Sequence, residues 1–349
     1  MNRTENLKSL EKLLYVNLKK EIGNSTVVLL DVPNYYNPGD QLIWEGEVQL
    51  LKKLDKQIRY TASALFFNPS VVSDEDCILL HGGGNFGDLY PMNQNFREMI
   101  VEKFPKNKII VLPETIHFSN EKLLKKCAKL FSKNSNVIIC ARDKKSFTLL
   151  EKHFLKSKHL LLPDMAFSIK SIIPETKNHR QEKVLFLSRT DGEIKKSVDK
   201  NSLGFIKELD ISDWPSYQYG AVALLIRIFI RYINRALLQV LKFLGLHWNK
   251  EHDALGLIKY HTKERQIQSG MKMISEYRLV ITSRLHGHIL ACLMGIPNII
   301  LDNSYGKNRN FFETWMVPNA FNSYYADSPE AVRKIIAEKF PTIKIAPHQ

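Results

Sequence analysis

A chain of 349 residues, 44% of them hydrophobic and 25% charged, has the composition of a globular protein and is long for a single domain. This composition excludes an intrinsically disordered chain. The formal net charge of +14 predicts an anionic partner, such as a phosphorylated substrate or an anionic lipid surface. Nucleic acid ranks last, because the chain has no RNP motif, zinc finger or basic region with heptads.

The cysteines indicate packed free thiols. Cys77, Cys127, Cys140 and Cys292 fall inside apolar patterns and lack the spacing of metal ligands. Free thiols fit a reducing compartment. Residues 1–23 form a charged amphipathic helix pattern without the apolar core of a signal peptide. We therefore expect a cytoplasmic protein, with no metal and no cofactor.

Short apolar runs alternate with helix patterns through the first half of the chain. Buried strands are predicted at residues 26–32, 58–62, 77–80, 108–112, 137–140 and 159–162. This alternation is typical of an α/β protein with a parallel sheet. Ligands bind at the carboxyl ends of the strands in such sheets, so the polar loops that follow the strands are the candidate sites.

The loop after the first strand is rich in turn residues and contains Asn37 and Asp40. A helix pattern follows at residues 41–54. Asp40 can cap that helix or belong to a site, and the sequence leaves both interpretations open.

A glycine-rich loop follows the strand at residues 77–80. Gly82, Gly84 and Gly87 match the G-x-G-x-x-G fingerprint of dinucleotide-binding proteins, but this is not the first βα unit, and the acid at the expected distance, Glu102, lies at helical spacing. The loop also resembles an esterase oxyanion loop, but the chain has no G-x-S-x-G elbow. With both motifs excluded, the glycines predict only a stretch of backbone that a ligand can approach closely.

Later strands also end in polar residues. His117 is either a packed core histidine or a site residue, and the sequence leaves both open. Arg142 and Asp143 form either a structural ion pair or an anion contact. Arg189 follows a strand at residues 184–187 in the second half of the chain.

Residues 171–183 lose apolar periodicity and predict a linker. We therefore expect an N-terminal domain at residues 1–175 and a C-terminal domain at residues 183–349.

The segment at residues 219–248 differs from the rest in composition. Arg227, Arg231 and Arg235 recur every four residues in an otherwise apolar helix pattern. The evenly spaced charges argue against a transmembrane span. Such a helix can lie in an anionic membrane interface or pack over the second domain, and both alternatives stay open.

The strongest candidate site lies in residues 277–308. A strand is predicted at residues 278–282 and a helix at residues 287–294, so Ser283, Arg284, Leu285 and His286 lie where a strand ends and a helix begins. Free backbone N–H groups and the helix dipole favour an anion at such a place.

The side chains there suit the same ligand. Arg284 supplies a planar charged fork for phosphate or carboxylate, and His286 can exchange a proton near neutral pH. Lys307 lies in the loop after the next strand, at residues 302–308, which we expect on the same edge of the sheet.

Together these motifs resemble the polysaccharide pyruvyl transferase family. The matching pieces are residues 37–40, 80–85, 112–116, 142–143, 163–164, 283–287 and 295–297. The resemblance implies two Rossmann-like domains facing a cleft, similar to GT-B glycosyltransferases. It also implies transfer of the enolpyruvyl unit of phosphoenolpyruvate onto sugar hydroxyls, giving a pyruvate ketal.

The resemblance places Arg284 and His286 on the Arg-Leu-His motif that the family uses for phosphoenolpyruvate. Glutamine often stands in the family where Glu114 stands here, and residues 219–248 are not part of the common pattern. No metal or covalent nucleophile is required, because phosphoenolpyruvate is itself the activated co-substrate.

We expect two sides of one site, with His286, Arg284 and Asp40 as catalytic residues and Asp40 as the base for a sugar hydroxyl. The donor side comprises Ser283, Arg284, Leu285, His286, Lys307, Arg189 and Arg142. The acceptor side comprises Asn37, Asp40, Gly83, Gly84, Asn85, Glu114 and His117. The expected acceptor is a glycan, polyprenyl-linked, at the inner face of the cell membrane.

Two other functions compete with this one. A GT-B glycosyltransferase that uses a nucleotide sugar would need a base- and ribose-reading acid in the second domain. A non-catalytic glycan- or lipid-binding protein would keep its function without Arg284 and His286.

Overall fold

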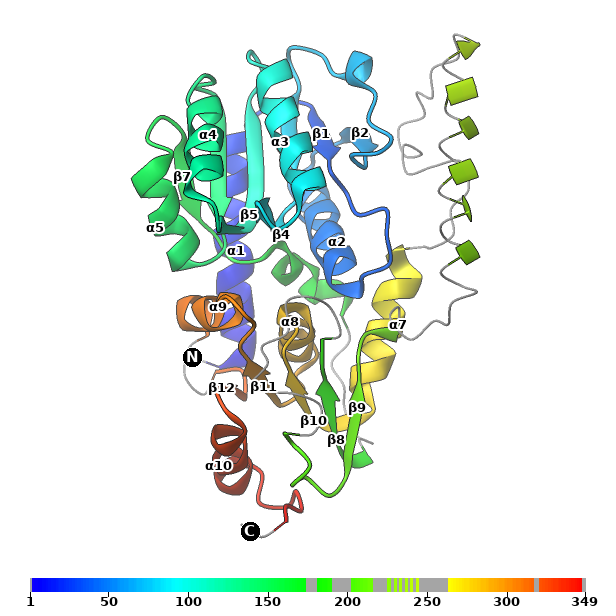
Figure 1. The fold of residues 1–349 in the computed structure, drawn as a ribbon, viewed down its shortest axis with the longest axis vertical. Coiled ribbons are helices and arrows are strands. Elements are labelled where there is room, and N and C mark those ends of the chain that lie inside the picture. Colours follow the sequence, from blue (N-terminus) through cyan, green and yellow to red (C-terminus); the bar gives the residue numbers. More distant parts are fainter. Residues whose placement is uncertain are drawn as a thin grey trace.

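The chain is described by a computed structural model. It describes residues 2–173, 181–189, 202–215, 263–316 and 320–346, and scattered residues between 225 and 244. Two parallel sheets, each flanked by helices, organise these residues, and Figure 1 shows one sheet above the other.

The first sheet has seven strands, all paired in parallel. Six of them lie in the order β2-β1-β3-β5-β6-β7, and β4 pairs with β5 beyond the end of β3. The strands are β1 (Val27–Leu30), β2 (Ile58–Ala62), β3 (Cys77–Leu80), β4 (Gly83–Gly87), β5 (Ile109–His117), β6 (Val137–Ala141) and β7 (Lys158–Leu161). Its helical elements are α2 (Pro38–Lys53), η1 (Pro69–Val71), α3 (Pro91–Lys103), α4 (Glu121–Phe131), α5 (Lys144–His153) and η2 (Met165–Ile172).

The second sheet has five parallel strands in the order β12-β11-β10-β8-β9. The strands are β8 (Gln181–Leu187), β9 (Leu209–Ser212), β10 (Tyr277–Thr282), β11 (Asn298–Leu301) and β12 (Ser323–Ala326). Its helices are α7 (Lys263–Ser275), α8 (Leu285–Met294), α9 (Lys307–Trp315) and α10 (Pro329–Lys339). The predicted α/β fold with two Rossmann-like parallel sheets is thereby confirmed.

The glycine-rich segment differs from the predicted loop, because it forms strand β4. Gly83 lies opposite Glu114 and Phe86 opposite Ile116 in the pairing with β5. The Phe86 ring is buried and packs edge-on against Phe154, 5.9 Å between centroids. One aromatic anchor therefore holds a segment whose glycines would otherwise favour an irregular loop.

Helix α1 (Arg3–Ile22) runs past both sheets, as Figure 1 shows. A capping box between Asn2 and Glu5 begins it. The Arg3 guanidinium donates to the carbonyl oxygens of Cys292 and Leu293 at 3.3 and 3.4 Å, where the carboxyl end of α8 favours a cation. Helix α1 therefore links the two halves.

The two halves also share a hydrophobic core. One buried cluster contains apolar side chains from α1, α2, α7, α8 and η2, and α2 packs against both α7 and α8. Of the predicted linker, residues 174–180 lie outside the described residues. The limits of the two domains therefore stay a prediction.

None of the described helices is long and apolar enough to cross a membrane. Arg227, Arg231 and Arg235 of the segment at residues 219–248 lie outside the described residues. All four cysteines are buried free thiols, as predicted, and burial raises the pKa of Cys77 to about 12.

Candidate active site

A cavity of about 250 Å³ lies where the carboxyl ends of the two sheets meet. Most of the predicted site residues line it, from both halves of the chain: Asn37, Asp40, Gly84, Asn85, Arg142, Arg189, Arg284, Leu285, His286 and Lys307. The sequence-based expectation that these strand exits converge is met.

Arg284 is held by a buried carboxylate. It is the N-terminal cap residue of α8 and only 4% exposed. Its Nη2 donates to Asp213 Oδ2 at 2.7 Å, and its Nε also pairs with Asp213. Asp213 follows β9, so the second sheet fixes the plane of the guanidinium before any ligand binds.

A second buried acid joins Arg142 to His286. Asp164 Oδ2 accepts from Arg142 Nη1 at 2.6 Å and lies 3.4 Å from His286 Nε2. Burial opposes the negative charge of Asp164, but His286 and Arg142 outweigh it and hold the pKa well below its usual range. Asp164 is therefore ionised and orients the imidazole.

Two glycines, Gly39 and Gly84, leave space for the side chains of His286 and Arg142, because a Cβ at either position would lie too close to them. A Cβ on Gly39 would lie 2.7 Å from His286 Nδ1, and one on Gly84 would lie 2.9 Å from Arg142 Nη2 and 3.6 Å from Lys307 Nζ. The cations can therefore approach the backbone of β4 only because residue 84 has no side chain.

Hydrogen bonds stabilise the loops at the carboxyl end of the second sheet, one between two loops and one within a single loop. The Arg189 backbone N–H donates to Ser283 Oγ at 3.2 Å, and the Lys307 backbone N–H donates to Asn303 Oδ1 at 2.8 Å. Ser283 is not among the residues that line the cavity, and its hydroxyl contacts the backbone of Arg189, which does line it.

The cap of α2 is Asn37, not Asp40. Asn37 Oδ1 accepts from the Gly39 backbone N–H at 3.0 Å. The carboxylate of Asp40 instead accepts from Tyr35 Oη and Asn37 Nδ2, both at 2.8 Å. The capping interpretation of Asp40 is therefore wrong, and its carboxylate lies at the cavity wall.

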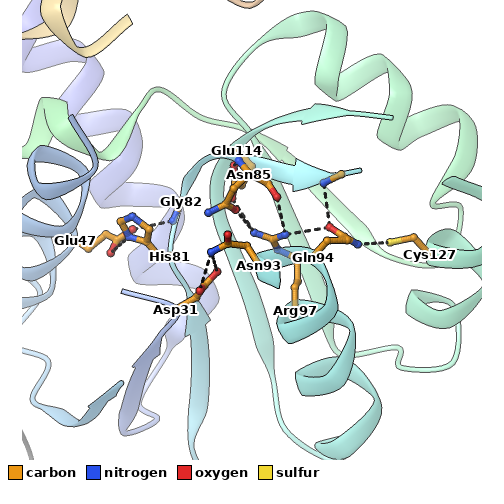
Figure 2. Close-up of polar contacts among 11 residues, drawn as sticks. Asp31, Glu47, His81, Gly82, Asn85, Asn93, Gln94, Arg97, Glu114 and Cys127 are labelled. Atoms are coloured by element: carbon orange, nitrogen blue, oxygen red, sulfur yellow. Dashed lines mark hydrogen bonds and ion pairs between the residues drawn. The ribbon is translucent and has the colours of Figure 1, made fainter. Parts of the chain in front are cut away.

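Three residues predicted on the acceptor side do not line this cavity, namely Gly83, Glu114 and His117. Glu114 is fully buried and accepts from Arg97 Nη2 at 2.9 Å, as Figure 2 shows; burial raises its pKa to about 7, against the opposing charge of Arg97. The His117 ring lies against Tyr305, with 4.7 Å between centroids, and so contacts the loop before α9.

Five further residues line the cavity that the sequence did not predict as site residues. They are Tyr35, Gly82, Tyr90, Asn93 and Trp214. Asp213 and Trp214 follow β9, a four-residue strand with no apolar run strong enough to predict it. Asp164 stood in a recognised Pro-Asp motif, and this was the available signal for its role.

Residues 37–305 match the model of the polysaccharide pyruvyl transferase family. The chain belongs to this family. The match includes the cavity residues from Asn37, the cap of α2, to His286, and it ends before Lys307.

Related proteins agree with the family. EpsO of Bacillus subtilis strain 168, assigned as a pyruvyl transferase, is 35% identical over 84% of this chain and 86% of its own length. Pyruvyl transferase 1 of Schizosaccharomyces pombe is 30% identical over 84% of this chain and 70% of its own length. A functionally uncharacterised protein of Klebsiella pneumoniae shares the fold, with a TM-score of 0.59 at 18% identity over 91% of this chain and 99% of its own.

Proposed function

We propose that this pyruvyl transferase moves the enolpyruvyl unit of phosphoenolpyruvate onto sugar hydroxyls of a lipid-linked polysaccharide repeat unit and closes a pyruvate ketal. The observation that carries the proposal is one cavity that combines several cations with a carboxylate. The residues that line it include the cations Arg142, Arg189, Arg284 and Lys307 and the acid Asp40.

The cations of the cavity suit the donor. Phosphoenolpyruvate carries a phosphate and a carboxylate, and both bind best to guanidinium forks and to free N–H groups at a helix start. Arg284 supplies a fork whose orientation Asp213 already fixes. Leu285 and His286 begin α8 and also line the cavity, so the amino end of that helix faces it.

His286 and Asp40 provide the proton transfers. Protonated His286 gives a proton to the methylene carbon of phosphoenolpyruvate, which leaves an oxocarbenium-like centre at the neighbouring carbon. A sugar hydroxyl attacks that carbon while Asp40 accepts its proton. The bond between that carbon and the phosphate oxygen then breaks, and phosphate leaves. A second hydroxyl attacks the same carbon to close the ketal and gives its proton to His286, which the first step left neutral.

A direct test measures phosphate release. The protein is incubated with phosphoenolpyruvate and candidate polyprenyl-linked sugars, and phosphate and the mass of the glycan product are followed. We expect release that depends on the acceptor and a ketal product with one pyruvate unit. Release without an acceptor, or a glycosyl product in a parallel incubation with a nucleotide sugar in place of phosphoenolpyruvate, would contradict the proposal.

We also propose that the protein works at the inner face of the cell membrane. The support is the basic stripe of Arg227, Arg231 and Arg235 in an apolar segment, and the net charge of +14. A polyprenyl-linked acceptor would lie at that surface.

A further inference from the structure

Two asparagine side chains line the cavity on the side of the first sheet, and buried charges hold them in opposite orientations. Asn85 lies on β4 and Asn93 on α3. Figure 2 shows both amides with their charged partners. Each amide has one end that donates hydrogen bonds and one end that accepts them.

Asn85 directs its oxygen inward. Its Oδ1 accepts from Arg97 Nη2 at 2.6 Å, and Arg97 is 1% exposed. A guanidinium can only donate, so the amide cannot be turned over without losing this bond. Glu114 holds Arg97 from behind at 2.9 Å and accepts from the Asn85 backbone N–H at 3.2 Å.

Asn93 directs its nitrogen inward. Its Nδ2 donates to Asp31 Oδ1 and Oδ2 at 3.1 and 3.2 Å. Asp31 is 5% exposed, follows β1, and adopts a left-handed backbone conformation with φ of 62°. An ionised carboxylate can only accept, so this amide is also fixed, in the opposite sense.

We infer that Asn93 and Asn85 form a matched acceptor–donor pair that reads neutral sugar hydroxyls, with Asn93 Oδ1 accepting from one hydroxyl and Asn85 Nδ2 donating to a hydroxyl oxygen. The inference rests on the proposed function, because it assigns the neutral amides of the cavity to the glycan and leaves the cations to the donor. Asp31 and Arg97 are positioning residues that act through the two amides. Within the described part of the chain, no hydrogen bond uses the other end of either amide.

The ionisation of Asp31 makes the proposed sugar binding depend on pH. A purely structural role of Asn93 would not produce this pH dependence. Burial raises the pKa of Asp31 to about 6, although Arg97 and His81 lower it; Glu47 also faces this carboxyl group and raises its pKa. Below that pH a protonated Asp31 can donate as well as accept. Asn93 is then free to turn over, and the acceptor it shows to the sugar is lost.

Binding of sugars tests the inference directly. Saturation-transfer NMR with the methyl glycosides of glucose, galactose, mannose and N-acetylmannosamine is recorded at pH 7.5, with and without phosphoenolpyruvate. We expect native protein to bind at least one glycoside, and Asn93→Ala and Asp31→Asn to bind it about 3- to 10-fold more weakly, the effect of one hydrogen bond. Asparagine tolerates the left-handed backbone at residue 31, so Asp31→Asn keeps the shape of the site.

Three controls sharpen the test. Asn95→Ala on the exposed side of the same helix should change nothing. A deoxy glycoside that lacks the hydroxyl read by Asn93 should bind native protein and Asn93→Ala equally. Lowering the pH from 7.5 to 5 should weaken binding by native protein more than binding by Asp31→Asn, in which Glu114 still titrates in this range.

The outcomes separate this inference from the proposed function. Binding of no glycoside by native protein, or equal binding by native protein and Asn93→Ala, overturns the inference even when acceptor-dependent phosphate release is seen. Glycoside binding that depends on Asn93, without phosphate release from phosphoenolpyruvate and any acceptor, supports the inference and contradicts the proposed transfer reaction.

Discussion

At the scale of single residues, the charges at the cavity are paired before a ligand arrives. Asp213 holds Arg284, and Asp164 holds both Arg142 and His286. Each acid is nearly inaccessible to solvent, so its charge is weakly screened and fixes the direction of its partner. Preorganisation of this kind lowers the cost of ordering side chains when the donor binds.

Substitutions of Arg284 test whether this residue binds the donor. Arg284→Lys keeps the charge and loses the fork, so the KM for phosphoenolpyruvate should rise about 10-fold, and Arg284→Ala should raise it about 100-fold, in line with a charge-assisted hydrogen bond. Steady-state phosphate release measures both.

Removal of the arginine alone leaves Asp213 as a buried unpaired charge and should lower the free energy of unfolding. The double substitution Arg284→Ala with Asp213→Asn therefore serves as the control for stability. An unchanged KM in a folded alanine variant would contradict the donor role.

Substitutions of His286 test whether this residue transfers a proton to phosphoenolpyruvate. His286→Gln and His286→Ala should stay folded and lose about 100- to 10,000-fold in kcat, the usual contribution of a general acid. His153→Gln, in the last turn of α5, is the matched control and should keep the native kcat. Near-native turnover in His286→Gln would leave this histidine with a packing role only.

At the scale of elements, strand β4 brings backbone to the cations. Gly84→Ala places a methyl group 2.9 Å from Arg142 Nη2, so that guanidinium must move. We expect a KM for phosphoenolpyruvate several-fold higher, while far-ultraviolet circular dichroism shows a folded protein. Gly270→Ala is the control, since its Cβ would meet only ordinary contacts from 3.4 Å outward and alanine favours a helix.

The segment at residues 219–248 tests the proposed membrane location. Each basic residue near an anionic leaflet contributes about 1 kcal/mol, an attraction that salt weakens. The native protein should therefore co-sediment with anionic vesicles at low salt and not with neutral vesicles. Replacing Arg227, Arg231 and Arg235 by glutamate should abolish this while activity on a short soluble acceptor persists. Absence of binding to anionic vesicles at low salt would leave packing as the role of the segment.

At the scale of the whole molecule, a buried ion pair couples stability to pH. His81 Nδ1 lies 2.9 Å from Glu47 Oε2, and both side chains are buried. Burial opposes the protonated imidazole, but the Glu47 carboxylate outweighs it and raises the pKa of His81 to about 9. The pair joins α2 to the start of the glycine-rich segment, because Glu47 Oε1 also accepts from the Gly82 backbone N–H at 2.9 Å.

In the folded protein the pKa of His81 is about 9, above its unfolded value near 6.5, so the protonated imidazole stabilises the folded state. This stabilisation is complete below pH 6.5 and is lost as the pH rises through about 9. Urea denaturation should therefore give a lower free energy of unfolding at pH 9.5 than at pH 7. His81→Gln should flatten this difference. An identical pH dependence in the native protein and in His81→Gln would show that the pair is not the cause.

Local patterns determined much of this protein. Apolar runs placed most strands of both sheets, and parallel pairing then put Arg142, Arg189, Arg284 and Lys307 at strand exits on a common edge. The order of the motifs indicated the family that residues 37–305 match. These inferences needed only periodicity and chain order.

The tertiary structure alone decided which side chains face one another. Asp213 and Arg284 are 71 positions apart, Asp164 and His286 are 122 apart, and Asp31 and Asn93 are 62 apart. The distance between two loops depends on how sheets and helices pack, which no local pattern records. Glu114 shows how far a local prediction can miss. It was predicted to follow a strand that ends at residue 112, but β5 continues to His117, and the Glu114 side chain is buried against Arg97. Hydrophobic periodicity assigns a residue to an element, and packing decides its partner.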